Sequence, residues 1–343
     1  MIRDTWLSLT RTPMASLYRV ILKNAWLITK KHLYLWPLGF FVAFLGNGGE
    51  YQILSKQIKK VSLQPETLSS LKSWFLSWSP NLNLSIGRSF LLALSLVVAL
   101  IILLFFIWLI ISSVAALIQG FNKASQEERG TFSSLLLNGS RSFKPVFVLY
   151  LIAKVIVYGV LVLIITPLMI TTFAQGNQSL NIFIIFLTFL IFIPLTIIVS
   201  FVTRYASAYV VLMGQKMWEA FKNGWRLFAA NWLISLEMAF ILLVINLLVS
   251  VVIFIVAFLL FSPFLFAGLV RTIEHPEAVW NFIFIPIILT IILTIIVGAG
   301  LATFQLGSWT LLFLRLTKGG KAYSKIVRWV ATFPEKFKKS ETK

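Results

Sequence analysis

Long runs of apolar residues dominate this sequence and predict helices that cross a membrane. Six runs stand out, at residues 33–45, 90–118, 146–173, 182–202, 232–261 and 282–314. A helix needs about 20 apolar residues to cross the roughly 30 Å hydrocarbon layer of a bilayer. The first run is short, whereas the second, fifth and sixth are longer than a bilayer requires and must tilt, kink or project. The pattern predicts an all-α, polytopic transmembrane bundle of about six spans, forming one membrane domain over residues 1–343.

Composition supports this fold class. The chain is 59% hydrophobic and 12% charged, whereas a soluble domain is about half apolar and a quarter charged. It contains no cysteine, which excludes disulfides, thiolate metal sites and a cysteine nucleophile. The net charge is +19, but the basic residues flank the apolar runs and form no polar domain of their own. Anionic lipid head groups are therefore the expected partner, and nucleic acid is not.

The distribution of Lys and Arg predicts the orientation. If the N-terminus is inside, the cytoplasmic segments contain most of the cations, including the basic tail at residues 315–343. Short cytoplasmic loops retain Lys and Arg, so we expect both termini to be cytoplasmic. The one sizeable extramembrane segment is then an outer loop at residues 46–89.

The N-terminal residues 1–32 have the pattern of an amphipathic helix lying in the inner interface. Its apolar face contains Met14, Leu17, Ile21, Ala25 and Ile28, and its basic face contains Arg19, Lys23 and Lys30. The C-terminal tail repeats the pattern more weakly, with Arg328 on its basic face. The sequence therefore predicts several interfacial helices on the cytoplasmic side.

An internal repeat precedes two of the spans. Both copies read NGxRxF: Asn138, Gly139, Arg141 and Phe143 before the third run, and Asn223, Gly224, Arg226 and Phe228 before the fifth. A looser copy, Lys23-Asn24-Ala25-Trp26, precedes the first run and matches Lys222-Asn223-Gly224-Trp225. Asn followed by Gly predicts the end of a helix, because Gly adopts the left-handed conformation that closes the last turn. The Arg is then either a positive-inside residue without a ligand or a bidentate ligand for lipid phosphate.

The stretch from Gly214 to Phe228, followed by Asn231-Trp232, resembles the glycerophosphoryl diester phosphodiesterase membrane-domain family and its uncharacterised prokaryotic relatives. The copy from Gly130 to Phe143 is similar to an earlier repeat of that family. The resemblance implies a polytopic fold in a prokaryotic plasma membrane. Some members carry a soluble phosphodiesterase domain, but its metal-binding carboxylates are missing here, so the resemblance does not extend to hydrolase activity.

The sequence offers little for catalysis. It contains one aspartate, and no GxSxG, HExxH, Walker A or dinucleotide motif. We therefore expect a non-enzymatic protein without a cofactor or metal. Two ionisable residues fall inside spans, Lys154 in the third and Glu237 in the fifth, at nearly the same depth under the repeat alignment. They either form a functional pair or serve only to anchor helices at the interface. Asn246 is a candidate for a polar contact between helices.

Two functions follow from these patterns. The first is binding or organising anionic lipids at the cytoplasmic face through a basic rim, composed of Arg19, Lys23, Lys30, Arg141, Arg226 and Arg328. The alternative is a transporter or lipid flippase with a path near Lys154 and Glu237. An enzyme acting on lipid phosphodiesters is a third and weaker hypothesis. Neither a protein partner nor an oligomeric state follows from the sequence.

Overall fold

The structure, a computed structural model, describes residues 17–45, 86–128, 130–173, 178–272 and 279–318. These residues form helices and no strand, which confirms the all-α prediction. The elements are α2 (Leu17–Lys31), η2 (Leu33–Leu35), α3 (Trp36–Ala43), α6 (Ile86–Ser125), α7 (Phe132–Arg141), α8 (Phe143–Phe173), α9 (Gln178–Met213), α10 (Met217–Ala230), α11 (Trp232–Thr272) and α12 (Val279–Thr317).

Five of the described helices are long and apolar enough to cross a membrane, so the chain is an integral membrane protein. Their candidate spans are Ala93–Ser125, Phe143–Ile164, Phe186–Met213, Trp232–Phe266 and Phe284–Thr317. The first apolar run forms only η2 and α3, and this shorter helical stretch ends at Ala43. At 1.5 Å per residue, it covers roughly half of the hydrocarbon layer. The sixth span therefore stays a prediction.

Several helices continue beyond the apolar runs that predict the spans. Helix α6 begins at Ile86, so residues 86–89, assigned to the outer loop, are helical. Helix α9 extends beyond residue 202 to Met213, and α11 extends beyond residue 261 to Thr272. Residues 315–317, expected in the tail, complete α12. The rest of the predicted outer loop, most of the tail with Arg328, and Met14 lie outside the described residues.

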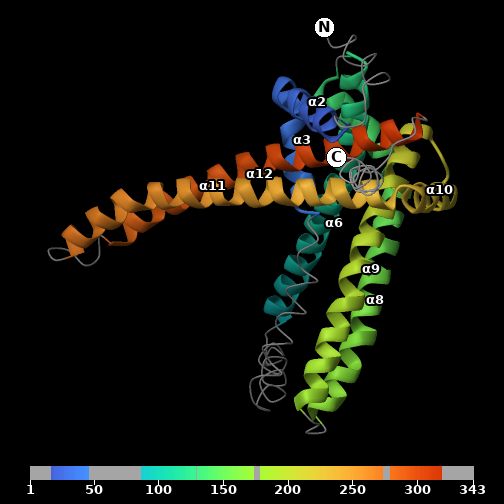
Figure 1. Ribbon diagram of the computed structural model, residues 1–343. Helices are drawn as coiled ribbons and strands as arrows, with labels where there is room; N and C mark the ends of the chain where they lie inside the picture. Colours follow the sequence, from blue (N-terminus) through green and yellow to red (C-terminus); the bar gives the residue numbers. More distant parts are fainter. Residues whose placement is uncertain (1–16, 46–85, 129, 174–177, 273–278, 319–343) are drawn as a thin grey trace, which may run out of the picture.

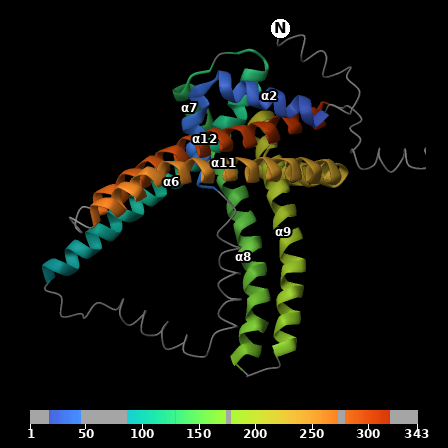
Figure 2. The ribbon, with the colours of Figure 1, turned by 60° about the vertical axis from the view of Figure 1, so that its left-hand side comes forward.

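The long helices form three arms that diverge from one junction (Figures 1 and 2). Helices α8 and α9 pair in one arm, α11 and α12 pair in the second, and α6 forms the third. The shorter helices gather at the junction, where α7 packs on α6, α10 packs on α9, and α2 packs on α12. Each amphipathic helix thus covers the junction end of one arm.

The divergence of the arms fits the length of their helices. The span Trp232–Phe266 contains 35 residues, which corresponds to roughly 52 Å of α-helix. A helix of that length fits within a hydrocarbon layer of about 30 Å only if it tilts by about 55°.

The amphipathic helices bury their apolar faces against the protein. In α2, Leu17, Ile21 and Ala25 are buried, as their spacing predicts, while Arg19 and Lys23 are exposed. The partner of this apolar face is α12 and not lipid alone. Several tryptophans of these helices remain exposed at the junction end, namely Trp26, Trp218 and Trp225. Tryptophan is enriched at membrane–water interfaces.

The prediction that Asn-Gly ends a helix was wrong for both copies of the motif. Gly139 lies inside α7 and Gly224 lies in the middle of α10. A Cβ on Gly139 would lie 2.5 Å from the carbonyl oxygen of Ser112, and one on Gly224 would lie 2.9 Å from the amide nitrogen of Ala206. The two glycines therefore let a short helix approach the backbone of the preceding long helix. The glycine that does end a helix is Gly214, whose φ of +63° closes α9.

Candidate functional site

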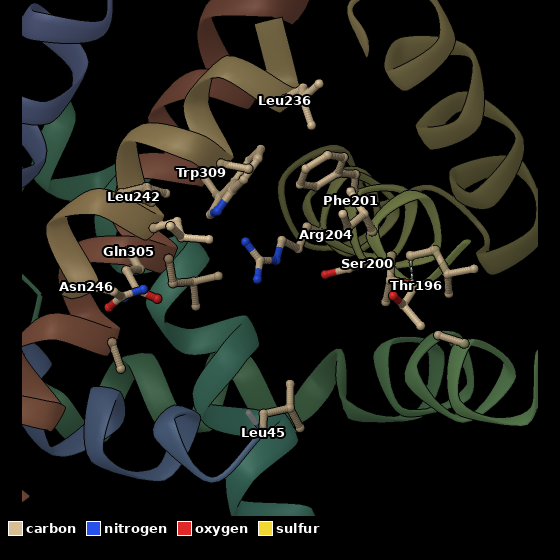
Figure 3. A pocket seen from close by; sticks show the side chains of 18 of the residues that line it. Leu45, Thr196, Ser200, Phe201, Arg204, Leu236, Leu242, Asn246, Gln305 and Trp309 are labelled. Carbon is tan, nitrogen blue, oxygen red and sulfur yellow. Dashed lines mark hydrogen bonds between the residues drawn. The ribbon is translucent and has the colours of Figure 1, made fainter. Parts of the chain in front are cut away.

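A cavity of about 980 Å³ lies where the α8/α9 arm meets the α11/α12 arm (Figure 3). The end of α3 and Tyr18 of α2 complete its wall. Most of the lining side chains are apolar, and the charged ones are Lys154, Arg204 and Glu237. Two cations against one carboxylate give the described lining a net charge of +1. The volume is at the upper end of the range of about 300–1,000 Å³ that is typical of ligand pockets.

Arg204 points into the middle of this cavity from α9 (Figure 3). Its guanidinium carbon lies 5.0 Å from the centroid of the Trp309 ring, which is a cation–π contact between α9 and α12. Within the described part of the chain, the Arg204 side chain makes neither a hydrogen bond nor an ion pair. An arginine has five N–H donors, so its capacity to bind an anion is unused.

The location of Arg204 differs from what the sequence predicts. Arg204 follows the fourth apolar run, which ends at residue 202, so the Lys and Arg distribution predicts that it is cytoplasmic; in the structure α9 continues and carries it into the candidate span Phe186–Met213. The end of an apolar run is therefore a poor guide to the end of this helix. A sequence signal was present, because small residues, Ser207 and Ala208, follow Arg204 at helical spacing, and the structure buries both.

Glu237 and Lys154, the two intramembrane charges that the sequence singles out, line this same cavity from different arms. The Tyr18 hydroxyl donates a hydrogen bond to the Glu237 carboxylate. Burial raises the pKa of Tyr18, and this hydrogen bond raises it further. The Lys154 ammonium lies 5.9 Å from the centroid of the Tyr158 ring. Pairing between Lys154 and Glu237 stays a prediction.

A side-chain amide pair lies on the wall that faces Arg204 (Figure 3). Gln305 of α12 donates a hydrogen bond to Asn246 of α11, which confirms the predicted polar contact between helices. Both side chains are partly buried, and both line the cavity. Their remaining amide groups have no hydrogen-bond partner among the residues that the structure describes.

The cavity is open toward the apolar surface of the arms. Phe240 and Leu243 line it from α11, and 65% and 59% of their respective surfaces are exposed. The cavity therefore combines charged side chains on its inner wall with an exposed apolar opening.

The basic rim is separate from this cavity. Arg19, Lys23 and Lys30 are exposed on α2, Arg141 is exposed on α7, and Arg226 is exposed on α10. None of them lines the cavity, so the structure spreads the rim over the junction surface and does not gather it into one site.

The other residues of the repeated motif have structural contacts. The Asn223 amide donates to Gln215 at 2.9 Å, and Asn138 is partly buried. The Phe228 ring is buried 5.7 Å from that of Phe201, and Phe143 stacks on Phe147. Phe228 therefore packs inside the protein.

No known family, curated protein or solved structure matches this chain. The similarity to the glycerophosphoryl diester phosphodiesterase membrane domain thus stays a prediction. Among the described residues, no group of three or more His, Asp or Glu side chains is arranged to hold a metal ion.

Proposed function

We propose that this protein is a non-enzymatic membrane protein that binds an anionic lipid, with the acidic head group on Arg204 in the central cavity. One observation carries the proposal: Arg204 enters a largely apolar cavity and has no anionic or hydrogen-bonding partner among the described residues. A charge inside a membrane protein is costly unless it is paired. A phosphate or carboxylate would remove this cost through bidentate, charge-assisted hydrogen bonds.

The shape of the cavity favours a lipid over a small soluble anion. Its opening presents Phe240 and Leu243 to the surface that faces hydrocarbon. Acyl chains could therefore extend between the arms while the head group reaches Arg204, and neither part of the molecule would have to leave its preferred environment.

The proposal places the junction at the cytoplasmic side of a prokaryotic plasma membrane. The exposed cations of α2, α7 and α10 all lie at the junction end, beside exposed tryptophans. Cytoplasmic leaflets attract such basic residues through their anionic lipids, by about 1 kcal/mol per Lys or Arg near the surface. In this arrangement the basic rim concentrates anionic lipid around the junction, and the cavity binds one such molecule.

The test compares two arginines. Arg204→Gln and Arg226→Gln each remove one positive charge, the first inside the cavity and the second on the exposed surface of α10. Native mass spectrometry would measure the affinity of each purified variant for phosphatidylglycerol. A charge-assisted hydrogen bond is worth about 1.5–3 kcal/mol, so we expect Arg204→Gln to lower the affinity of the tightest site by about 10- to 100-fold. If both variants lose affinity equally, the ligand does not bind in the cavity.

A second candidate function is lipid transport along a path near Lys154 and Glu237. The observation that favours it is that both charged groups line the same lipid-facing cavity. The test is lipid translocation in liposomes, comparing the wild type with Lys154→Met and Glu237→Gln. Translocation that is lost in both variants would support transport. Translocation that persists in both, or that never occurs in the wild type, would reject it.

A further inference from the structure

The Asn246–Gln305 amide pair has hydrogen-bonding capacity that its own contact does not use. Each side-chain amide offers two N–H donors and a carbonyl acceptor, and the pair shares one hydrogen bond between Gln305 and Asn246. No other hydrogen bond of either amide involves a described residue. Because both line the cavity, the unused groups are accessible to a ligand there.

An amide pair in this position has a cost that a simple interhelical contact does not explain. Polar groups that face an apolar cavity without a partner destabilise a protein by roughly 1–3 kcal/mol each. Two leucines would hold α11 to α12 through packing alone. A polar ligand atom beside the pair would offset the cost.

The pair and Arg204 line the same cavity from different arms. Figure 3 shows the Arg204 guanidinium directed from α9 toward the wall that carries Asn246 and Gln305. A ligand whose anionic group lies on Arg204 therefore has the amides beside it in the cavity.

We infer that the Asn246–Gln305 pair binds the ester carbonyls of a diacyl phospholipid whose phosphate lies on Arg204. This inference rests on the proposed function and narrows its ligand class. In a glycerophospholipid, only the glycerol backbone separates the phosphate from two carbonyl acceptors, which match the free N–H donors of the amides. A phosphate attached directly to a hydrocarbon chain, such as a polyprenyl phosphate, has no such acceptors and leaves the amides unpaired.

Diacyl and dialkyl forms of one lipid provide the test. Phosphatidylglycerol with ester-linked chains and its ether-linked counterpart share charge and chain length but differ in the two carbonyls. Native mass spectrometry of the wild type with an equimolar mixture should show preferential binding of the ester form by about 2- to 10-fold, the equivalent of one net hydrogen bond. Equal binding of the two lipids would overturn the inference.

The double variant Asn246→Leu with Gln305→Leu identifies the residues responsible. Replacing both partners leaves no orphaned amide, so we expect the variant to bind the ether form as the wild type does and to lose the preference for the ester. A preference that survives in this variant would also overturn the inference. If the double variant does not fold, Asn246→Leu with Gln305→Met serves instead, because methionine preserves the length of the glutamine side chain and this pair also removes every amide N–H donor.

The outcomes separate this inference from the proposed function. If Arg204→Gln abolishes tight binding of both lipids while the wild type does not distinguish them, the anionic site stands and the carbonyl site is rejected. If Arg204→Gln changes nothing, the proposed function itself fails.

Discussion

A single methyl group at Gly139 should destabilise this protein, although it would stabilise most helices. Alanine is favoured over glycine in a helix interior by about 1 kcal/mol. At Gly139, however, a Cβ would lie 2.5 Å from the Ser112 carbonyl oxygen and 2.8 Å from the Ala116 amide nitrogen. These are backbone atoms of α6, so α7 must move away from α6 to relieve the contact. Overpacking of this kind costs about 1–3 kcal/mol.

Gly159 provides the matched control, because a Cβ there meets nothing within 4 Å. It also lies within a described helix, α8, so Gly159→Ala should keep the gain from helix propensity. We expect Gly139→Ala to be less stable than Gly159→Ala by about 1–3 kcal/mol. Thermal unfolding in detergent, followed by intrinsic tryptophan fluorescence, measures the difference.

Gly139→Asn distinguishes packing from the helix-stop hypothesis. Asparagine tolerates the left-handed conformation that ends helices, so a helix stop would accept it with little loss. Close packing predicts that the larger side chain destabilises more than alanine does. Equal stability of Gly139→Ala and Gly159→Ala, or a well-tolerated Gly139→Asn, would refute the packing explanation.

Three further predictions follow. Tyr18→Phe removes the hydroxyl that donates to Glu237 and should lower the free energy of unfolding by about 1–3 kcal/mol. Adding Glu237→Gln should recover part of this loss, which a double-mutant cycle would measure. Burial lowers the pKa of His32, and the charge of Lys31 lowers it further. The folded state therefore keeps its full stability above the ordinary histidine pKa of about 6.5 and loses stability as the pH falls through the lowered pKa. A melting temperature that declines between pH 7 and 5 in the wild type but not in His32→Gln would bear this out, and identical profiles would contradict it. The double variant Arg141→Gln with Arg226→Gln removes two charges of the rim. It should bind more weakly to vesicles that contain anionic lipid but should keep the most tightly bound lipid. Loss of that lipid would place the binding site on the rim.

The sequence predicted the long helices because apolar length is a strong physical constraint in a bilayer. It placed the start of α11 at residue 232, where the helix does begin. It also predicted the buried face of α2, since Leu17, Ile21 and Ala25 recur at helical spacing. Helix ends were less predictable, because α9 continues for eleven residues beyond the expected end at residue 202 on side chains that the protein itself buries.

Only part of the cavity lining could be predicted from the sequence. Lys154 and Glu237 are conspicuous as charges inside apolar runs, but Arg204 follows such a run and resembles an ordinary positive-inside residue. Its role depends on Trp309 and Gln305, which are more than a hundred residues away in the chain. The packing of Gly139 against Ser112 is hidden as well, because it joins two different helices. A single sequence contains no signal for such contacts, because they arise from how the arms meet.

A cryo-electron microscopy structure of the protein in nanodiscs containing phosphatidylglycerol tests the central claim most directly. The account predicts density for a phosphate within hydrogen-bonding distance of the Arg204 guanidinium, with acyl chains passing between the α8/α9 and α11/α12 arms beside Phe240. An empty cavity in such a membrane, or an Arg204 guanidinium that is paired with a carboxylate of the protein itself, would contradict it.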